Sequence, residues 1–404
     1  MSYKGIPSFG LKFTLIGHTK PVNSLAVSGN GAFLLSGADD ASIVIWSLES
    51  GEVYQKILTP FHGPTSIVAW TPMSDDSPTG NFAFGSADGS ISVYQQGRGG
   101  GQTFDFASLT TAHGGPIEDL AFDPYLRRLA SVGSGGLKIW DMDMTGQITL
   151  LRTTPPRPFI LRSAAFFDRG KSIVVCYLES HEIVAYEIDP WSMKWSHQLP
   201  TRIGNAALSV DERTLIVSNL KDGIDTYSLP PRQPLRSFRH SISCNVPLSV
   251  CSTLDGALIL AGSDDGYPRI YDQRLGTLSQ TLPHSQGQCG CFFSHNILAD
   301  YVWGIGSLVQ AGYSRNGRCL LVTGSSDKQS TIEIKVWAES KVDSQTNEGT
   351  QQPAKHYLSF SIWQLLLVFF VSLMMQVLVS RIPKKADAIN TLLNAVAGYI
   401  LPRN

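Results

Sequence analysis

One pattern recurs seven times along the first 340 residues of this 404-residue chain, and it restricts the fold more than any other feature. Residues 17–46 read GHTKPVNSLAVSGNGAFLLSGADDASIVIW. They contain an alternating apolar run, an Asn-Gly turn, a second apolar run and an Asp-Asp turn before a closing SIVIW. Period-2 alternation with turns every 8–12 residues or so is typical of antiparallel strands. The segment therefore predicts three consecutive strands.

The same order of features recurs in six further segments, at residues 62–94, 113–141, 163–186, 206–227, 240–272 and 309–337. In each segment an aromatic residue closes the third strand: Trp46, Tyr94, Trp140, Tyr186, Tyr227, Tyr271 and Trp337. Five of the six intervals between these residues are 41 to 48 residues long, and the last is 66. A repeat of about 40–45 residues is typical of one four-stranded propeller blade. The long last interval predicts an insertion at 285–308.

The chain resembles the WD40-repeat family over about residues 10–338. The residues that carry the resemblance are Gly17-His18 with Trp46, His113 with Trp140-Asp141, and His240 with Tyr271-Asp272. The resemblance implies an all-β, seven-bladed β-propeller spanning residues 1–338. It also implies a hydrogen-bonded chain inside the first blade, formed by His18, Ser36, Asp40 and Trp46.

Other blades keep only part of this motif. Asp88 with Tyr94, Asp265 with Tyr271, and Trp337 hold matching positions, but Phe84 and Ala261 replace the hydroxyl residue. The third blade has GSGG in place of an Asp turn, and the fourth and fifth lack the Gly-His. Since these His and Asp residues recur from blade to blade, we expect a structural role for them, because a nucleophile and its base are needed only once.

Both ends of the repeat region suggest how the ring closes. The stretch after Trp337, AESKVDSQTNEGTQQ, is polar and poor in strand formers, so the last blade lacks an outer strand. Residues 10–17 form a good strand that precedes the first blade. We therefore expect residues 10–17 to complete the seventh blade, which removes an exposed sheet edge.

A long apolar stretch follows the repeats. Residues 357–380 contain no charged side chain, and a helix of this length spans about 36 Å against a hydrocarbon core of about 30 Å. A transmembrane helix is predicted, preceded by a polar linker at 339–356 and followed by a short amphipathic tail at 381–404. Basic residues flank the span at Lys355, Arg381, Lys384 and Lys385.

Topology has two interpretations. The span lies close to the C-terminus, and the propeller region has no signal peptide and no glycosylation sequon, which favours tail anchoring with a cytosolic propeller. Arg381, Lys384 and Lys385 follow the span, and the positive-inside rule then favours the reverse orientation. We adopt the tail-anchored interpretation, at the membrane of the endoplasmic reticulum or another organelle in preference to the plasma membrane.

Composition and motifs exclude several function classes. The net charge is −1 and only 16% of residues are charged, which does not suggest nucleic-acid binding. The six cysteines are scattered, so no metal site is expected, and no GxSxG, P-loop, HExxH or EF-hand pattern occurs. The sequence therefore predicts no catalytic residue, no cofactor and no small-molecule substrate.

The remaining hypotheses concern binding. We expect a non-catalytic protein–protein interaction scaffold that is tethered to a membrane, and the apolar insertion at 285–308 is a candidate contact for a partner or for lipid. One alternative is a membrane-anchored regulator or exchange factor of a small GTPase in vesicle trafficking at the endoplasmic reticulum, to which the layout is similar. Another is an unrecognised enzyme that uses the propeller channel.

Overall fold

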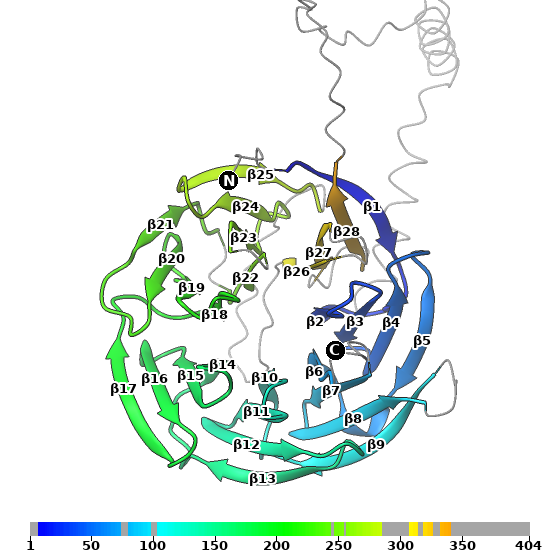
Figure 1. Ribbon diagram of the computed structural model, residues 1–404. Coiled ribbons are helices and arrows are strands. Elements are labelled where there is room, and N and C mark those ends of the chain that lie inside the picture. The colour runs from blue at the N-terminus through cyan, green and yellow to red at the C-terminus, as the bar shows by residue number, and fades with distance from the viewer. Residues whose placement is uncertain are drawn as a thin grey trace, which may run out of the picture. The chain divides into compact units, whose positions relative to one another are not determined.

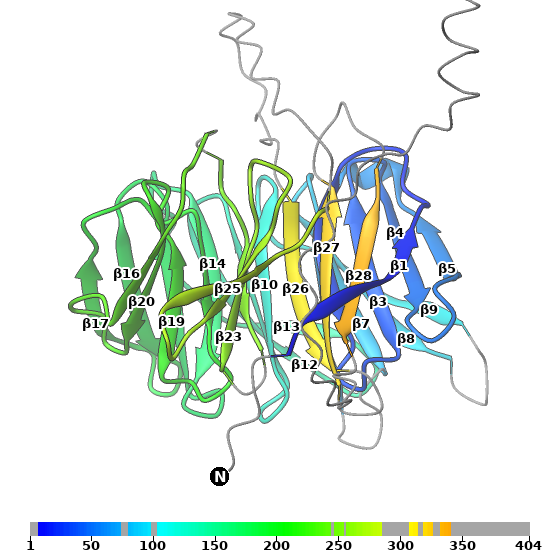
Figure 2. The same cartoon turned by 90° about the horizontal axis from the view of Figure 1, so that it is seen from above.

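A computed structural model describes residues 7–73, 80–97, 103–243, 246–253, 256–284, 307–313, 318–325 and 332–340, with only the backbone at 307–313. The chain divides into two units, Met1–Val342 and Asp343–Asn404, and the second unit lies outside the described residues. In the described part of the first unit, 28 strands form seven antiparallel sheets of four strands each. The sheets are blades arranged around a ring (Figure 1), which Figure 2 shows from the side. The predicted all-β seven-bladed propeller is confirmed.

Each blade has four strands that follow one another from the channel to the rim. From the innermost strand outward, the first three blades are β2 (Val22–Val27), β3 (Phe33–Ala38), β4 (Ser42–Ser47) and β5 (Val53–Leu58); β6 (Thr65–Trp70), β7 (Asn81–Ser86), β8 (Ser90–Gln96) and β9 (Phe104–Thr111); and β10 (Ile117–Asp123), β11 (Arg128–Gly133), β12 (Gly136–Met142) and β13 (Ile148–Thr153). The fourth and fifth are β14 (Leu161–Phe167), β15 (Ser172–Tyr177), β16 (Glu182–Glu187) and β17 (Ser192–Gln198); and β18 (Asn205–Leu208), β19 (Thr214–Ser218), β20 (Gly223–Ser228) and β21 (Arg236–Arg239).

The sixth blade consists of β22 (Val250–Ser252), β23 (Leu258–Ala261), β24 (Arg269–Asp272) and β25 (Thr277–Thr281). The seventh consists of β26 (Ser307–Tyr313), β27 (Cys319–Ser325), β28 (Ile334–Glu339) and β1 (Phe9–Leu15). One 3-10 turn, η1 (Pro60–His62), lies between β5 and β6. Since β26 begins at Ser307, the predicted insertion of 285–308 overlaps this strand by two residues, and residues 285–306 lie outside the described residues.

Burial explains why the second strand of the fourth blade is almost entirely apolar. Every residue of β15 (SIVVCY) is buried, because both faces of this strand pack against neighbouring blades. The outermost strand β17 (SMKWSHQ) is mostly exposed. A strand buried on both faces reads as continuous hydrophobic sequence, whereas an edge strand tolerates polar residues.

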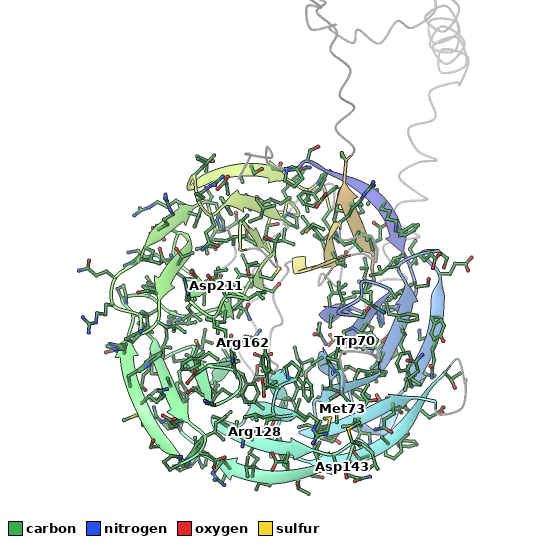
Figure 3. All side chains as sticks on the ribbon, in the orientation of Figure 1. Trp70, Met73, Arg128, Asp143, Arg162 and Asp211 are labelled. Carbon is green, nitrogen blue, oxygen red and sulfur yellow. The ribbon has the colours of Figure 1, made fainter. Side chains whose placement is uncertain are left out.

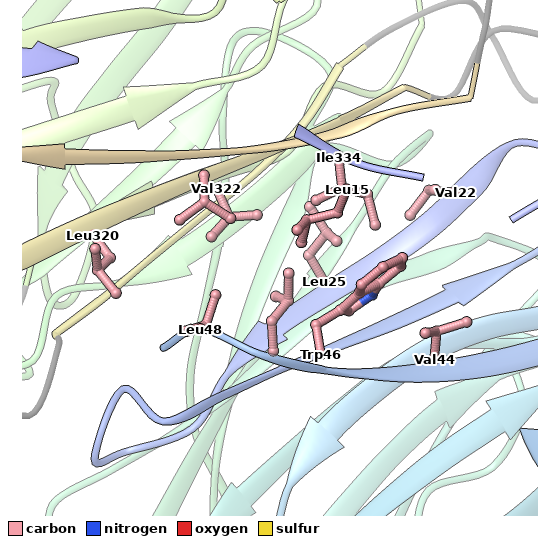
Figure 4. Close-up of a cluster of buried hydrophobic side chains, with 11 residues drawn as sticks. Leu15, Val22, Leu25, Val44, Trp46, Leu48, Leu320, Val322 and Ile334 are labelled. Carbon is pink, nitrogen blue, oxygen red and sulfur yellow. The ribbon is translucent and has the colours of Figure 1, made fainter. Parts of the chain in front are cut away.

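The N-terminal strand closes the ring. β1 pairs antiparallel with β28, from Phe9 opposite Glu339 to Leu15 opposite Ile334. The buried cluster between the seventh and first blades brings Leu15 and Ile334 together with Trp46 (Figure 4). The N–H of Ser340 also bonds to the carbonyl of Ser8, so the contact between the two ends of the ring continues to Ser340.

Side chains of the inner strands tie neighbouring blades together around the channel. Ser24 accepts the backbone N–H of Val68 at 3.1 Å, and Ser163 accepts that of Ala206 at 3.0 Å. Asp119 accepts the N–H of Ala164 at 2.9 Å, and Asn205 accepts the N–H of Val250 at 3.0 Å. Ser24, Asp119 and Ser163 follow register shifts in their strands. Such bulges re-aim a side chain, in this ring toward the next blade.

Candidate functional site on the connecting loops

Two kinds of loop occupy the same face of the ring in each blade. A connecting loop leads from the previous blade into the innermost strand, and a middle turn joins the second strand to the third. Since consecutive strands are antiparallel, the start of the first strand and the end of the second lie at the same face. In the first blade the connecting loop holds His18 and the middle turn holds Asp40.

The first blade contains the hydrogen-bonded chain that the resemblance implied. His18 Nε2 lies 2.7 Å from Ser36 Oγ, and Trp46 Nε1 donates to the same oxygen at 2.8 Å. At the other end, His18 Nδ1 lies 3.2 Å from Asp40, which also accepts the N–H of Thr19 at 2.9 Å. Burial alone would raise the pKa of Asp40, but the hydrogen bonds from its neighbours outweigh this effect, and the pKa lies well below its ordinary value.

The second blade keeps the outer part of this chain and loses the inner part. His62 Nδ1 lies 2.7 Å from Asp88, and Ser90 donates to Asp88 at 2.6 Å. Phe84 removes the hydroxyl acceptor. Tyr94 instead packs in a set of rings, stacked on Phe82 with their centroids 5.4 Å apart. Aromatic packing therefore replaces the buried hydrogen bond of the tryptophan.

The third blade shows the reverse pattern. Ser131 lies 2.9 Å from His113 Nε2 and accepts a hydrogen bond from Trp140 Nε1 at 2.9 Å. Sequence reasoning did not single out Ser131, which lies opposite Lys138, two residues before Trp140, just as Ser36 lies opposite Val44, two residues before Trp46. Burial, with Lys138 nearby, lowers the pKa of His113 to about 4, so the ring is neutral at physiological pH. Asp141 is exposed and lies 3.7 Å from Arg128, away from the chain.

In the sixth blade the turn carboxylate Asp265 pairs with a neighbouring arginine. This carboxylate accepts hydrogen bonds from Arg269 and from the N–H of Tyr267, and it does not bond to His240. The hydroxyl of Tyr271 instead lies 3.0 Å from His240 Nδ1. A phenol is long enough to reach the histidine directly where Ala261 leaves no hydroxyl.

A second carboxylate of the sixth blade, Asp272, stabilises a turn. Asp272, which is buried, accepts the N–H groups of Arg274 and Leu275 at 2.7 Å each. It therefore caps the turn into β25 and takes no part in the histidine chain.

The seventh blade has its own histidine, which the sequence analysis missed. His284 Nδ1 lies 2.6 Å from Thr323, which also accepts the Nε1–H of Trp337 at 3.0 Å. Nε2 of His284 lies 2.9 Å from Ser325. The preceding residue is Pro283, so no Gly-His pair marks the position, and the insertion separates His284 from β26. Burial lowers the pKa of His284 to about 4, with a further contribution from Lys335.

Two of the cavities on the described part of the ring bear on binding. One, of about 210 Å³, lies in the central channel and includes Glu118, Asp119 and Arg162 in its lining. Arg162, which Figure 3 labels on the channel side of its blade, forms an ion pair with Glu118 at 2.7 Å. Burial raises the pKa of Asp119 to about 7 against the effect of its backbone hydrogen bonds.

The other cavity, of about 360 Å³, lies between the connecting loops of the third and fourth blades and reaches from Gly114 to Leu161. Exposed aromatic side chains stand on the same face. Phe61, in η1, is 95% exposed, and Phe159, in the wall of the cavity, is 39% exposed. An exposed aromatic side chain beside a concave site is typical of an interaction surface.

Several predicted features lie elsewhere. The membrane span at 357–380 and its flanking residues Lys355, Arg381, Lys384 and Lys385 are outside the described residues. Over the residues that the structure does describe, no helix combines the length and apolar character needed to cross a bilayer. Within the same residues, no group of three or more His, Cys, Asp or Glu side chains is placed to hold a metal ion.

Comparison with known proteins identifies the repeats. Residues 9–47, 106–141 and 232–272 match the family described as WD domain, G-beta repeat. The chain carries WD40 repeats. Each matched segment begins on or just before the outermost strand of one sheet and continues into the next blade, so the WD40 sequence repeat is offset from the structural blade by one strand.

Curated relatives of the WD40 propeller match only in part. Human Striatin-4 is 24% identical over 67% of this chain and 38% of its own length. COMPASS component SWD3 of Saccharomyces cerevisiae is 32% identical over 33% of this chain and 42% of its own. The U3 small nucleolar RNA-associated protein 15 homolog of Xenopus tropicalis is 24% identical over 50% of this chain and 36% of its own. The chain thus spans about two fifths of the length of these relatives.

Proposed function

We propose that this protein is a protein-interaction scaffold whose propeller is tethered to a membrane. The observation that carries the proposal is the connecting-loop face, where Phe61 and Phe159 are exposed and Phe159 lines a cavity of about 360 Å³. Each histidine chain is internal to its blade and serves to hold these loops in place. A rigid frame with exposed loops is suited to binding other proteins.

The relatives support this role in general terms. Striatin-4 and SWD3 share WD40 sequence with this chain, and the name of SWD3 describes a component of a larger assembly. The partners of those proteins belong to those proteins. For this chain, the loops supply the binding surface, and the identity of the partner is set by side chains such as Phe61, Phe159 and Arg157.

The tether is the finer part of the proposal. Its support is the uncharged sequence at 357–380, which is long enough for a bilayer and has basic residues on both sides. The polar residues 341–356 join it to the propeller, whose last described residue is Ser340. In this arrangement the propeller works on the cytosolic side of an organelle membrane.

A direct test compares the proximity-labelled neighbours of two chains in cells. One is the full chain and the other ends at Ser340, both with a biotin ligase at the N-terminus. We expect shared partners that depend on the loops, and membrane neighbours for the full chain alone. The double variant Phe61→Ser, Phe159→Ser should lose partners while it remains folded. Neighbours identical to those of the free ligase would refute the scaffold, and a diffuse full chain would refute the tether.

A regulator of a small GTPase at the endoplasmic reticulum is a narrower form of the same proposal. Its support is only the order of a propeller followed by an apolar stretch. Nucleotide-exchange assays with purified GTPases of that membrane test it directly, and no stimulation by the full chain would exclude it.

A further inference from the structure

The third blade differs from every other blade in the chemistry of its middle turn. Between the second and third strands, the other six blades each carry at least one carboxylate: Asp39 and Asp40, Asp88, Glu179, Asp222, Asp264 and Asp265, and Asp327. The third blade has only Ser134-Gly135 there. This turn is one residue shorter than the turn between the second and third strands of the first blade.

In four blades this carboxylate binds the connecting loop of its own blade. Asp40 accepts the N–H of Thr19 at 2.9 Å, and Glu179 accepts the N–H of Ile160 at 2.7 Å. Asp264 accepts the N–H of Ser243, and Asp88 lies 2.7 Å from a ring nitrogen of His62. A carboxylate at this place therefore joins the turn to the loop, whichever donor the loop offers.

The third blade keeps a loop donor of this arrangement without the acceptor. Gly114 corresponds to Thr19, whose N–H binds a carboxylate in the first blade. His113, which corresponds to His18, bonds instead to the backbone of Gly133 and Ser131. Neither Ser134 nor Gly135 can supply a negative charge. The place of the missing carboxylate is open, because the cavity of about 360 Å³ is lined there by Gly114, Gly115, Ser134 and Gly135.

The protein's own turn cannot fill this space. Gly135 has a φ of +72°, and a Cβ added to it would lie 1.9 Å from the carbonyl oxygen of Arg157. The N–H of Arg157 also bonds to the carbonyl of Gly135 at 3.0 Å. The loop of the fourth blade therefore leaves no room for a side chain at Gly135, and the cavity stays available to a group from another molecule.

The opposite wall of the cavity suits an acidic residue with an apolar neighbour. Arg157 lines it, fixed by an ion pair with Glu182 at 2.7 Å and by packing over the ring of Tyr177 at 5.0 Å. Pro158 and Phe159 add an apolar surface beside this guanidinium. A cation that is held in place recognises a carboxylate with little loss of side-chain entropy.

We propose that this cavity binds an Asp or Glu side chain of a partner protein, which completes the third blade from outside. Rigid donors on the glycine loop and the guanidinium of Arg157 surround the carboxylate, and Phe159 contacts an apolar residue next to it in the partner. The inference rests on the proposed scaffold function and names the chemistry of one of its contacts.

The test uses the full chain and a library of random 12-residue peptides displayed on phage. Selection on the natural protein is paired with counter-selection on a turn variant in which Ser134-Gly135 is replaced by Ala-Asp-Gly, the sequence at 87–89. This variant carries the carboxylate in its own turn, so it should fold and exclude the ligand. We expect the peptides that distinguish the two proteins to share an Asp or Glu beside an apolar residue.

One selected peptide is then synthesised with its acidic residue and with the matching amide. The amide should bind at least about tenfold more weakly, as expected for the loss of a charge-assisted hydrogen bond. Arg157→Gln should weaken the acidic peptide to a similar degree. The control Arg152→Gln should leave binding unchanged, because Arg152 pairs with Asp189 at 2.5 Å, away from the cavity.

The outcomes separate the two proposals. Equal binding of the acid and amide peptides, or peptides that bind the turn variant as well as the natural protein, would overturn the carboxylate site and leave the scaffold standing. A library that yields no binder at all would count against both. If the turn variant does not fold, the peptides selected on the natural protein and the Arg157→Gln and Arg152→Gln pair still decide.

Discussion

Acid should weaken the seventh blade through His284, and the size of the effect follows from the structure. The ring is buried between Thr323 and Ser325, and its pKa of about 4 lies below the ordinary 6.5. Because the folded pKa is depressed, the histidine's contribution to stability is full above pH 6.5 and is lost as the pH falls toward 4. A shift of this size corresponds to about 3 kcal/mol in total, of which about 2 kcal/mol is lost between pH 7 and pH 5.

The variant His284→Gln tests this directly. Glutamine keeps a polar group near Thr323 and Ser325 but does not titrate, so the variant should be less stable than the natural protein at pH 7. The free energy of unfolding is measured by urea denaturation followed by tryptophan fluorescence. Between pH 7 and pH 5, it should fall by about 2 kcal/mol less in the variant than in the natural protein. The two stability curves should therefore approach each other as the pH is lowered.

A matched control is His197→Gln. His197 lies on the outer strand β17 and takes no part in any of the described histidine chains. Its curve should stay parallel to that of the natural protein. If His284→Gln and the natural protein lost the same stability between pH 7 and pH 5, the argument from burial would be wrong.

Three further changes probe the frame of the ring. Ser131→Ala removes the hydroxyl between His113 and Trp140, leaving two buried groups unpaired, and should lower the free energy of unfolding by about 2–4 kcal/mol in urea titrations; a loss under 1 kcal/mol would contradict it. Gly85→Ala places a Cβ 2.4 Å from Ile117 on the next inner strand and should lower the melting temperature more than Ala at Gly256 does, where an added Cβ meets nothing within 4 Å. Burial raises the pKa of Asp119 in the folded state above its value in the unfolded state, so the natural protein should lose stability as the pH rises from about 4 to 7. Asp119→Asn should remove this loss, and an unchanged pH profile would exclude this.

The repeat made the fold predictable, whereas the site depended on details that a repeat does not carry. Seven closing aromatic residues define seven blades even where the histidine is absent, because strand burial alone produces the alternation. His284 escaped notice because its partner strand β27 begins at Cys319, beyond the insertion. The bond between Asp265 and Arg269 was not predicted either, because residue spacing does not show which side chain an arginine contacts.

The only sign of the candidate binding cavity in the sequence was that the third blade departs from the repeat pattern. The GSGG of the third blade showed that the Asp turn is missing. Whether a cavity forms there depends on the loop of the fourth blade, which leaves no room for a side chain at Gly135 and places Arg157 in the opposite wall. Contacts between blades join residues more than 20 positions apart, and their geometry follows from packing. The membrane segment remains a prediction from its sequence.

The pairing of β1 with β28 also determines when the ring can close during synthesis. The strand that completes the ring is made first, and its partner is made about 320 residues later. At a synthesis rate of about 5–20 residues per second, roughly 15–60 s pass before the two can meet. During that interval Phe9–Leu15 is a strand without a sheet, and six blades stand as an open arc with an unpaired edge. A cell that makes this protein must protect that edge until the last blade is complete.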